Sequence, residues 1–138
     1  MATIRNHVTR DVAALEGSST CREAAALMAE RRIGSVAVRE GTRLVGLVTE
    51  RDLVATVLAR GGDGSLPLRQ AMRPLPVVAP SASDTECADL MRDQFTRHLL
   101  VEEAGKLVGV VSMRDIIQVM LDEKQFVIDQ LKDYIGRG

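Results

Sequence analysis

The chain repeats itself at a fixed distance, and this repeat constrains its fold more than any other feature of the sequence. A shift of 63 residues places residues 8–58 on residues 71–121 without a gap, and 15 of the 51 pairs are identical. Unrelated segments of ordinary composition would share roughly three or four. A unit of about 50 residues buries too little surface to fold alone. We therefore expect the two copies to pack their sheets together around a common core.

Each repeat shows the same order of predicted elements. The capping boxes Thr20-x-x-Glu23 and Ser83-x-x-Glu86 predict helices of about three turns. A short extended lead-in precedes each helix, and two short strands and a second helix follow it. The lead-ins are 12–15 and 75–78, the strands are 35–39, 43–48, 98–102 and 106–111, and the second helices begin near Thr49 and Ser112. The predicted fold class is α/β (α+β), with two pseudo-symmetric repeats.

The repeats divide the chain into four parts. We expect a first repeat over residues 8–60 and a second over 71–121. The segment 61–70 between them is typical of a linker, because it is rich in glycine and proline. Residues 122–138 have no counterpart in the first repeat and extend a helix predicted over 113–135. The apolar stripe of this helix needs cover from its own domain or from a second chain, and we expect a homodimer.

Composition excludes several classes of function. The net charge of −1 and the pI near 6.1 argue against a nucleic-acid surface, which needs a basic stripe. Only 2% of the residues are aromatic, so bases would find no stacking platform. No apolar run approaches the ~20 residues of a membrane span, and no export signal opens the chain. We expect a cytoplasmic protein in which Cys21 and Cys87 are reduced packing residues.

A short motif occurs once in each repeat, as GLVTERDL at 46–53 and GVVSMRDI at 109–116. One interpretation is structural: the hydroxyl and the acid three residues later cap the start of a helix. The other is functional, because free N–H groups at a helix start attract phosphate and a carboxylate can accept ribose hydroxyls. The spacing alone leaves both open. Gly46 and Gly109 either let a base approach the backbone or relieve crowding against the neighbouring sheet.

Taken together, the duplicated motifs resemble a tandem pair of CBS domains, the Bateman module, over about residues 8–121. No single motif is specific, but their duplication at a constant offset is. The stretches that carry the resemblance are Ala24-Ala25-x-x-Met28, Ile33–Val38 and Gly46–Leu53 in the first repeat, and Ala88-x-x-Met91, Arg97–Val101 and Gly109–Ile116 in the second.

The resemblance implies two composite clefts for an adenosine nucleotide. In the family, the hydroxyl and the Asp of the motif contact phosphate and ribose, and the opposite repeat completes each cleft. The first site then combines residues of both repeats, namely Thr49, Arg51, Asp52, Leu75, Pro76, Arg97 and His98. The second site combines Ser112, Arg114, Asp115, Val12, Ala13, Gly34 and Ser35.

The two implied clefts differ in charge. Arg97 stands where the γ subunit of AMP-activated protein kinase, which it resembles there, has a phosphate-binding arginine, whereas Gly34 at the equivalent place is uncharged. The Asp52 site is therefore expected to bind a phosphorylated adenosine more tightly. An alternative is that Arg97 forms a surface ion pair with Asp93 or Glu103.

The predicted function is regulatory and not enzymatic, because no catalytic constellation, metal-ligand set or phosphate-binding loop is recognisable. We expect a module that needs no cofactor and binds AMP or ATP, with NAD and S-adenosylmethionine as further ligands to test. It would signal to an unknown regulated protein, without nucleic acid or membrane as partners. Two alternatives remain open, a ligand-free oligomerisation or protein-interaction module and an enzyme that acts on a nucleotide.

Overall fold

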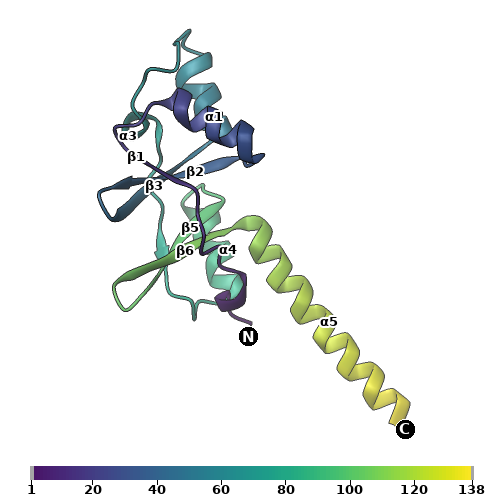
Figure 1. The fold of residues 1–138 in the computed structure, drawn as a ribbon. Helices are drawn as coiled ribbons and strands as arrows, with labels where there is room; N and C mark the ends of the chain where they lie inside the picture. The colour runs from purple at the N-terminus through teal and green to yellow at the C-terminus, as the bar shows by residue number, and fades with distance from the viewer. Residues whose placement is uncertain (1, 138) are drawn as a thin grey trace. The chain divides into compact units, whose positions relative to one another are not determined.

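The computed structural model describes residues 2–137, which form two compact units (Figure 1). The first-repeat unit consists of Asp11–Leu75. The second-repeat unit combines the residues up to Arg10 with those from Pro76 onward. Each unit contains helices and one three-stranded sheet, which confirms the mixed α/β fold with two repeats. Within the described residues, no helix has the length and apolar character needed to cross a membrane.

The first-repeat unit has strands in the order β1-β2-β3. Strand β1 pairs parallel to β2, and β2 and β3 form an antiparallel hairpin. Helix α2 continues directly into a π-helical turn, η2. The elements are β1 (Ala14–Glu16), α1 (Cys21–Arg31), β2 (Ser35–Glu40), β3 (Arg43–Thr49), α2 (Glu50–Leu53), η2 (Val54–Leu58) and α3 (Leu68–Ala71).

The second-repeat unit has the same topology, with strands in the order β4-β5-β6. Its last helix is much longer than the equivalent helix of the first unit. The elements are η1 (Arg5–His7), β4 (Val77–Val78), α4 (Asp84–Asp93), β5 (His98–Glu103), β6 (Lys106–Ser112) and α5 (Met113–Arg137). The strands and helix starts predicted from the sequence are confirmed to within two residues.

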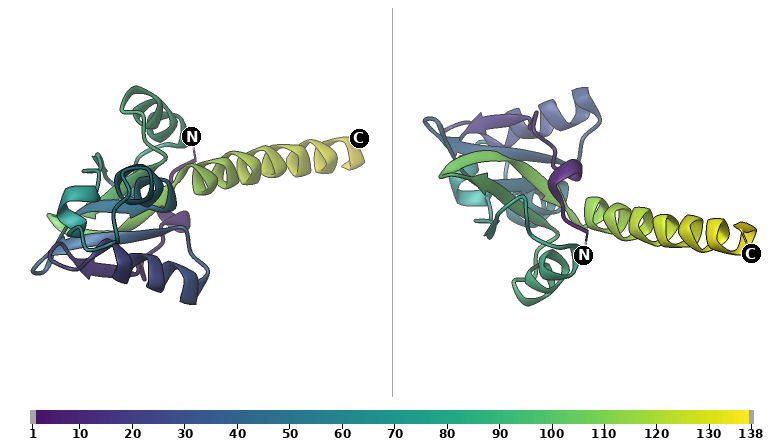
Figure 2. Two further views of the ribbon diagram at one scale, coloured as in Figure 1. Left: turned by 90° about the horizontal axis from the view of Figure 1, so that it is seen from above. Right: turned by 90° about the horizontal axis from the view of Figure 1, so that it is seen from below.

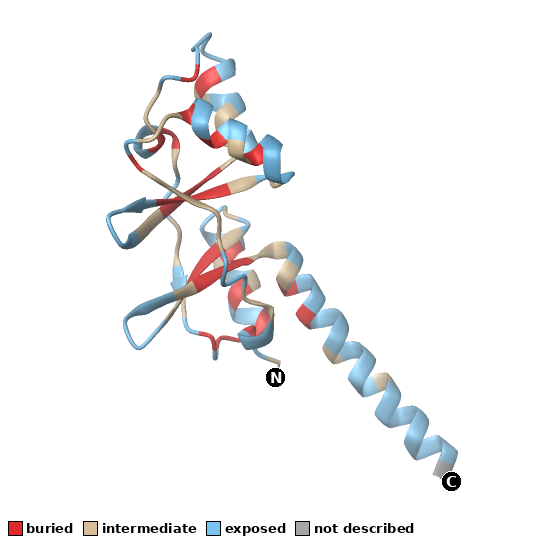
Figure 3. Cartoon of the chain, viewed as in Figure 1, coloured by how far each residue is buried: buried red, intermediate tan, exposed pale blue. Residues whose placement is uncertain are grey.

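Each unit has its own buried core between the sheet and the first helix (Figure 3). Met28 in α1 and Met91 in α4 occupy equivalent places in the two cores. Thr20 and Ser83 cap these helices, because their hydroxyls accept the amide N–H of the residue three positions later at 3.1 Å. The structure shows this half of each predicted capping box and not the return bond from Glu23 or Glu86. Alternating strand residues complete the cores, with Val36, Val38 and Val48 in one and Leu99, Val101 and Val111 in the other.

The lead-in segments begin earlier than the predicted 12–15 and 75–78, at Ile4 and Leu68, and they show a register that the gapless alignment does not give. Arg73 exchanges backbone hydrogen bonds with Leu47 in β3, whereas Thr9 exchanges them with Val110 in β6. Since Val110 is the counterpart of Leu47, Thr9 rather than Arg10 is the structural counterpart of Arg73. The offset here is one residue greater than 63, and it returns to 63 where β1 and β4 begin.

The segment predicted as a linker, residues 61–70, contributes to a core. Helix α3 begins inside it, and Leu68 has no exposed surface. Ile4, its counterpart in the other lead-in, is also fully buried. Each of the two residues belongs to the core of the sheet that its lead-in covers, so the lead-in segments are structural parts of the units.

The structure explains the glycine of each motif. A side chain at Gly46 would collide with the carbonyl oxygen of Arg73, and one at Gly109 with that of Thr9. Both glycines also lie next to a β-bulge in their hairpin. The close approach of the lead-in backbone therefore accounts for glycine here. Relief of crowding is confirmed, but its source is the lead-in backbone and not the neighbouring sheet that the sequence suggested.

Helix α5 extends the predicted helix to Arg137. Its first turns pack against α4 and η1, with Ile116 and Val119 buried, and its C-terminal half projects from the rest of its unit (Figure 2). Large apolar side chains on this helix are exposed, namely Ile117, Met120, Leu121, Phe126, Val127, Leu131, Tyr134 and Ile135. An isolated helical segment of this length is marginal in water.

Candidate functional site

A closed hydrogen-bonded ring joins Thr49 and Asp52 at the start of α2. The Asp52 carboxylate oxygen Oδ2 accepts the Thr49 amide N–H at 2.8 Å and the Thr49 hydroxyl at 2.9 Å. The Thr49 hydroxyl oxygen in turn accepts the Asp52 amide N–H at 3.2 Å. This reciprocal arrangement is a capping box, so the structural interpretation of the motif is confirmed.

The same ring forms between Ser112 and Asp115 at the start of α5. Asp115 Oδ2 accepts the Ser112 amide at 2.8 Å and its hydroxyl at 2.9 Å, and the Asp115 amide donates back to the hydroxyl oxygen at 3.2 Å. Both rings are partly buried. The repeat therefore places a fixed hydroxyl beside a fixed carboxylate twice, each at the end of a hairpin strand.

The two carboxylates differ in their remaining oxygen. Asp52 Oδ1 lies 3.0 Å from Nε of Arg73, and the Asp52 side chain is only 12% exposed. Within its own unit, Asp115 forms no ion pair with any described residue. The reason is the lead-in register, since the position of Arg73 is taken by Thr9 in the second-repeat unit.

The other predicted site residues lie at the same hairpin ends. The Gly34 carbonyl accepts the amide N–H of Glu50 at 3.0 Å, and Ser35 pairs with Thr49 across the hairpin. In the second-repeat unit, the Arg97 carbonyl accepts the amide N–H of Met113 at 2.8 Å, and His98 pairs with Ser112. Arg51 and Arg114, which follow the two hydroxyls, are exposed.

Arg97 is exposed and does not form the surface ion pair with Asp93 or Glu103 that the sequence left open. Glu103 instead pairs with Arg5 at 3.3 Å, and Asp93 pairs with Arg92 at 3.1 Å. Within the part of the chain that the structure describes, no ion pair involves Arg97.

The predicted lead-in residues Val12, Ala13, Leu75 and Pro76 are half-buried beside the first strand of each sheet. The Ala13 carbonyl accepts the amide N–H of Ala37 at 2.8 Å, and the Pro76 carbonyl accepts that of Leu100 at 2.9 Å. Each predicted site takes residues from both units. Their assembly into two clefts stays a prediction.

The cysteines are buried thiols. Burial raises the pKa of Cys21, and burial together with the charges of Glu86 and Asp84 raises the pKa of Cys87 to about 11. A high thiol pKa opposes nucleophilic and metal-binding roles. Among the described residues, no cluster of His, Cys, Asp and Glu has the arrangement of a metal site.

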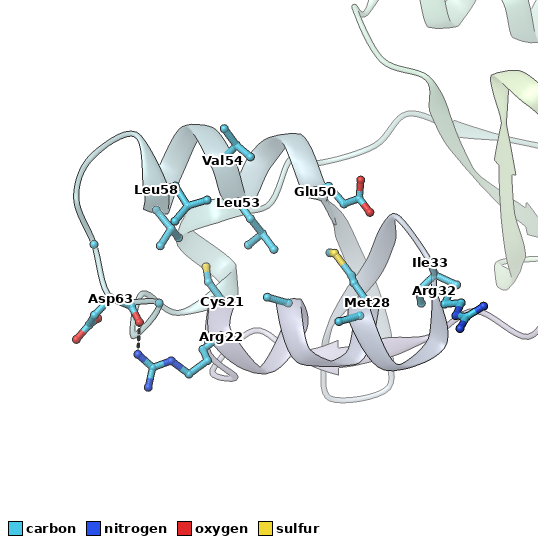
Figure 4. A pocket seen from close by; sticks show the side chains of 15 residues that line it. Cys21, Arg22, Met28, Arg32, Ile33, Glu50, Leu53, Val54, Leu58 and Asp63 are labelled. Atoms are coloured by element: carbon cyan, nitrogen blue, oxygen red, sulfur yellow. Dashed lines mark hydrogen bonds between the residues drawn. The ribbon is translucent and has the colours of Figure 1, made fainter.

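A hollow of about 730 Å³ lies within the first-repeat unit, between α1 and the helical segment α2–η2 (Figure 4). Leu53 and Leu58 face Cys21 and Met28 across it. Its mainly apolar lining suits hydrocarbon rather than phosphate. The motif hydroxyl and carboxylate do not line it. Sequence reasoning missed this hollow, although the apolar run that follows the first motif was a signal for it.

Comparison with known families gives the context for this geometry. The family model of the CBS domain matches the chain twice, over residues 4–59 and 68–122. The chain belongs to the CBS-domain family. The two matches begin at the buried lead-in residues Ile4 and Leu68, which supports the structural equivalence of the lead-ins in these CBS repeats.

Relatives and solved structures of similar length agree with this assignment. The CBS domain-containing protein YhcV of Bacillus subtilis is 31% identical over 117 residues, which cover 84% of either chain. The structure of a protein with CBS domains from Burkholderia ambifaria has a TM-score of 0.76 and 31% identity, and the match covers 82% of this chain and 85% of that one. CBS domain protein PAE2072 from Pyrobaculum aerophilum, solved in complex with AMP, has a TM-score of 0.70 and 29% identity, with coverage of 82% and 88%.

Proposed function

We propose that this CBS-domain protein is a regulatory module, not an enzyme, that binds an adenosine nucleotide of the AMP, ADP or ATP type and signals to a partner protein. The observation that carries the proposal is the ring of hydroxyl and carboxylate, which recurs in both repeats with equal distances. A fixed carboxylate suits recognition of ribose hydroxyls, and the neighbouring arginines suit phosphate. The AMP complex of PAE2072 supports the ligand class.

The proposed contacts are those implied by the motifs. Thr49 and Asp52 serve one ligand, and Ser112 and Asp115 serve the other, each completed by the strand start and lead-in of the opposite repeat. The exposed Arg97 would contribute a positive charge to the first site. Binding would regulate a partner only if the nucleotide has different affinities for two states of the module.

Calorimetry with AMP and ATP tests the proposal, with NAD and S-adenosylmethionine as further ligands. Asp52→Asn and Asp115→Asn should each abolish one binding event. Asp89→Asn, an exposed carboxylate on α4, is the matched control and should leave both events intact. Because Asp52 and Asp115 also cap helices, urea denaturation of each variant must show that it remains folded. Absence of both heat and thermal stabilisation with every ligand would contradict the proposal and favour a ligand-free interaction module.

We further propose that a second copy of the chain covers the exposed apolar face of α5. Ile117, Leu121, Ile128, Leu131 and Ile135 follow one another at spacings of four, seven, three and four residues, so they share one face of the helix, and Lys124 occupies the place between Leu121 and Ile128. Apolar residues at such spacings are typical of helices that pair along their length. The wild-type protein should therefore have twice the chain mass of 15.0 kDa in light scattering at micromolar concentration.

Substitutions on α5 test this dimer. Leu131→Lys combined with Ile135→Lys should produce the monomer mass, because both side chains are exposed apolar members of the stripe. Gln130→Lys adds a charge to an exposed polar position of the same helix and should leave the dimer intact. A monomer mass for the wild type would contradict this part of the proposal.

A further inference from the structure

We propose that Arg73 sets the ligand affinity of the Asp52 site, because it covers the carboxylate oxygen that a ribose would use. The inference rests on the proposed function, since it concerns the ribose of an adenosine ligand. It starts from the one charged contact that distinguishes two otherwise equal rings, the ion pair between Arg73 and Asp52 at 3.0 Å.

The hydrogen bonds of Asp52 show which oxygen remains for a ligand. Oδ2 already accepts the amide and the hydroxyl of Thr49, so both of its lone pairs are used. Oδ1 is the remaining acceptor, and Nε of Arg73 lies 3.0 Å from it in an ion pair. An ion pair at this distance competes directly with a ribose hydroxyl for the same carboxylate oxygen. Adenosine must therefore displace Arg73 or share Oδ1 with it.

Asp115 is not covered in this way. Its Oδ2 has the same two partners in Ser112, but within its unit no ion pair reaches the carboxylate from the described residues. The lead-in residue beside it is Thr9, whose backbone pairs with Val110 as that of Arg73 pairs with Leu47. A ribose hydroxyl can therefore reach the remaining carboxylate oxygen of Asp115, whereas Arg73 covers that of Asp52.

The ion pair between Arg73 and Asp52 changes the relative ligand affinities of the two sites that Arg97 alone would predict. Arg97 favours phosphate at the Asp52 site, but Arg73 opposes ribose there. Since the Arg73 side chain is 48% exposed, the ion pair is partly screened by water and can be displaced. Exposed ion pairs of this strength correspond to an affinity change of about two- to fivefold. Arg73 therefore lowers the ligand affinity of the Asp52 site and does not prevent binding.

Calorimetry with adenosine and AMP on the full chain tests the role of Arg73. Asp115→Asn isolates the Asp52 site, and in this background Arg73→Thr should tighten the binding of both ligands by about two- to fivefold. Adenosine has no phosphate, so an equal gain for both ligands assigns the effect to ribose. Thr9 occupies the equivalent place in the second-repeat unit. The backbone pairing of residue 73 with Leu47 does not involve the side chain, so the Arg73→Thr variant should fold.

The reciprocal change provides the matched control. With Asp52→Asn as background, Thr9→Arg should weaken both ligands at the Asp115 site by a similar factor. In ¹⁵N-labelled Asp115→Asn protein, the Nε–H resonance of Arg73 should shift when adenosine is added.

Three outcomes would overturn the inference, and they are distinguishable. If Arg73→Thr weakens AMP and leaves adenosine unchanged, Arg73 is a phosphate ligand. If the affinities and the Nε–H resonance do not change although ligand binds, Arg73 has no part in binding and the proposed function still stands. If neither adenosine nor AMP binds any of the variants or the wild type, the proposed function fails together with the inference.

Discussion

The two repeats of this protein have the same local structure in their hairpins and motifs and differ in the segments on either side. Each has a bulged hairpin, a close lead-in over a glycine and a ring of hydroxyl and carboxylate. Beyond the ring, the first repeat forms the short segment α2–η2 and the chain turns back into α3, whereas α5 continues to Arg137. The motif therefore determines the geometry of its own ring. The segments before and after the motif determine whether the carboxylate has an arginine partner and how far the second helix extends.

The largest effect should come from the buried lead-in residues, which test whether the two lead-ins are equivalent. Leu68→Ala and Ile4→Ala should each lower the free energy of unfolding by about 2–5 kcal/mol, because both side chains are fully buried. Urea denaturation measures this loss. The exposed neighbours provide the controls Arg69→Ala and Arg5→Ala, which should cost less than about 1 kcal/mol. A small cost at Ile4 alone would break the equivalence.

The second prediction distinguishes the repeats by pH. The pKa of Cys87 is raised to about 11 in the folded protein from an ordinary value of 9.0, so the unfolded chain loses this proton first. Stability should therefore decrease as the pH rises from about 9 to 11, by roughly 2–3 kcal/mol. Ala24 occupies the same place in the first repeat, and Cys87→Ala should remove this part of the pH dependence. An unchanged pH profile in denaturation experiments would contradict the assignment.

The third prediction concerns the close approach of the lead-ins. Gly46→Ala and Gly109→Ala should each destabilise the protein by about 1–3 kcal/mol, because the added carbon collides with a backbone carbonyl that cannot rotate away. Gly34→Ala is the control, since a side chain there would make only ordinary contacts with Glu50. Thermal and urea unfolding should show little change for the control. Tolerance of alanine at Gly46 or Gly109 would reopen the interpretation that a base approaches there.

The smallest effect should come from the rings themselves. Thr49→Ala and Ser112→Ala should each cost about 1 kcal/mol, the usual value for a lost N-cap, and the two losses should be similar because the ring distances agree. Thr42→Ala in the exposed hairpin turn is the control. Urea denaturation that shows a loss for only one ring would mean that the two copies are not energetically equivalent.

Much of the fold followed from short-range patterns. Capping motifs predicted the helix starts at Thr20, Thr49, Ser83 and Ser112, and pairs of short strand segments predicted the hairpins. These features depend on residues a few positions apart, so the sequence carries them directly. The hydroxyl and the carboxylate of each motif lie together for the same reason. The buried role of Leu68 did not, because its partners lie in distant strands.

The sequence by itself determined the repeat, the elements within it and the hydroxyl and carboxylate of each motif. Only the tertiary structure decided the register of the lead-ins, which paired Thr9 and not Arg10 with the place of Arg73. A gapless alignment sets the two arginines opposite each other and so conceals the difference between the sites. Register between distant segments depends on how whole sheets pack and hydrogen-bond, and a slip of one residue is visible only there. That slip leaves Asp52 paired with Arg73 and Asp115 without an arginine from its lead-in.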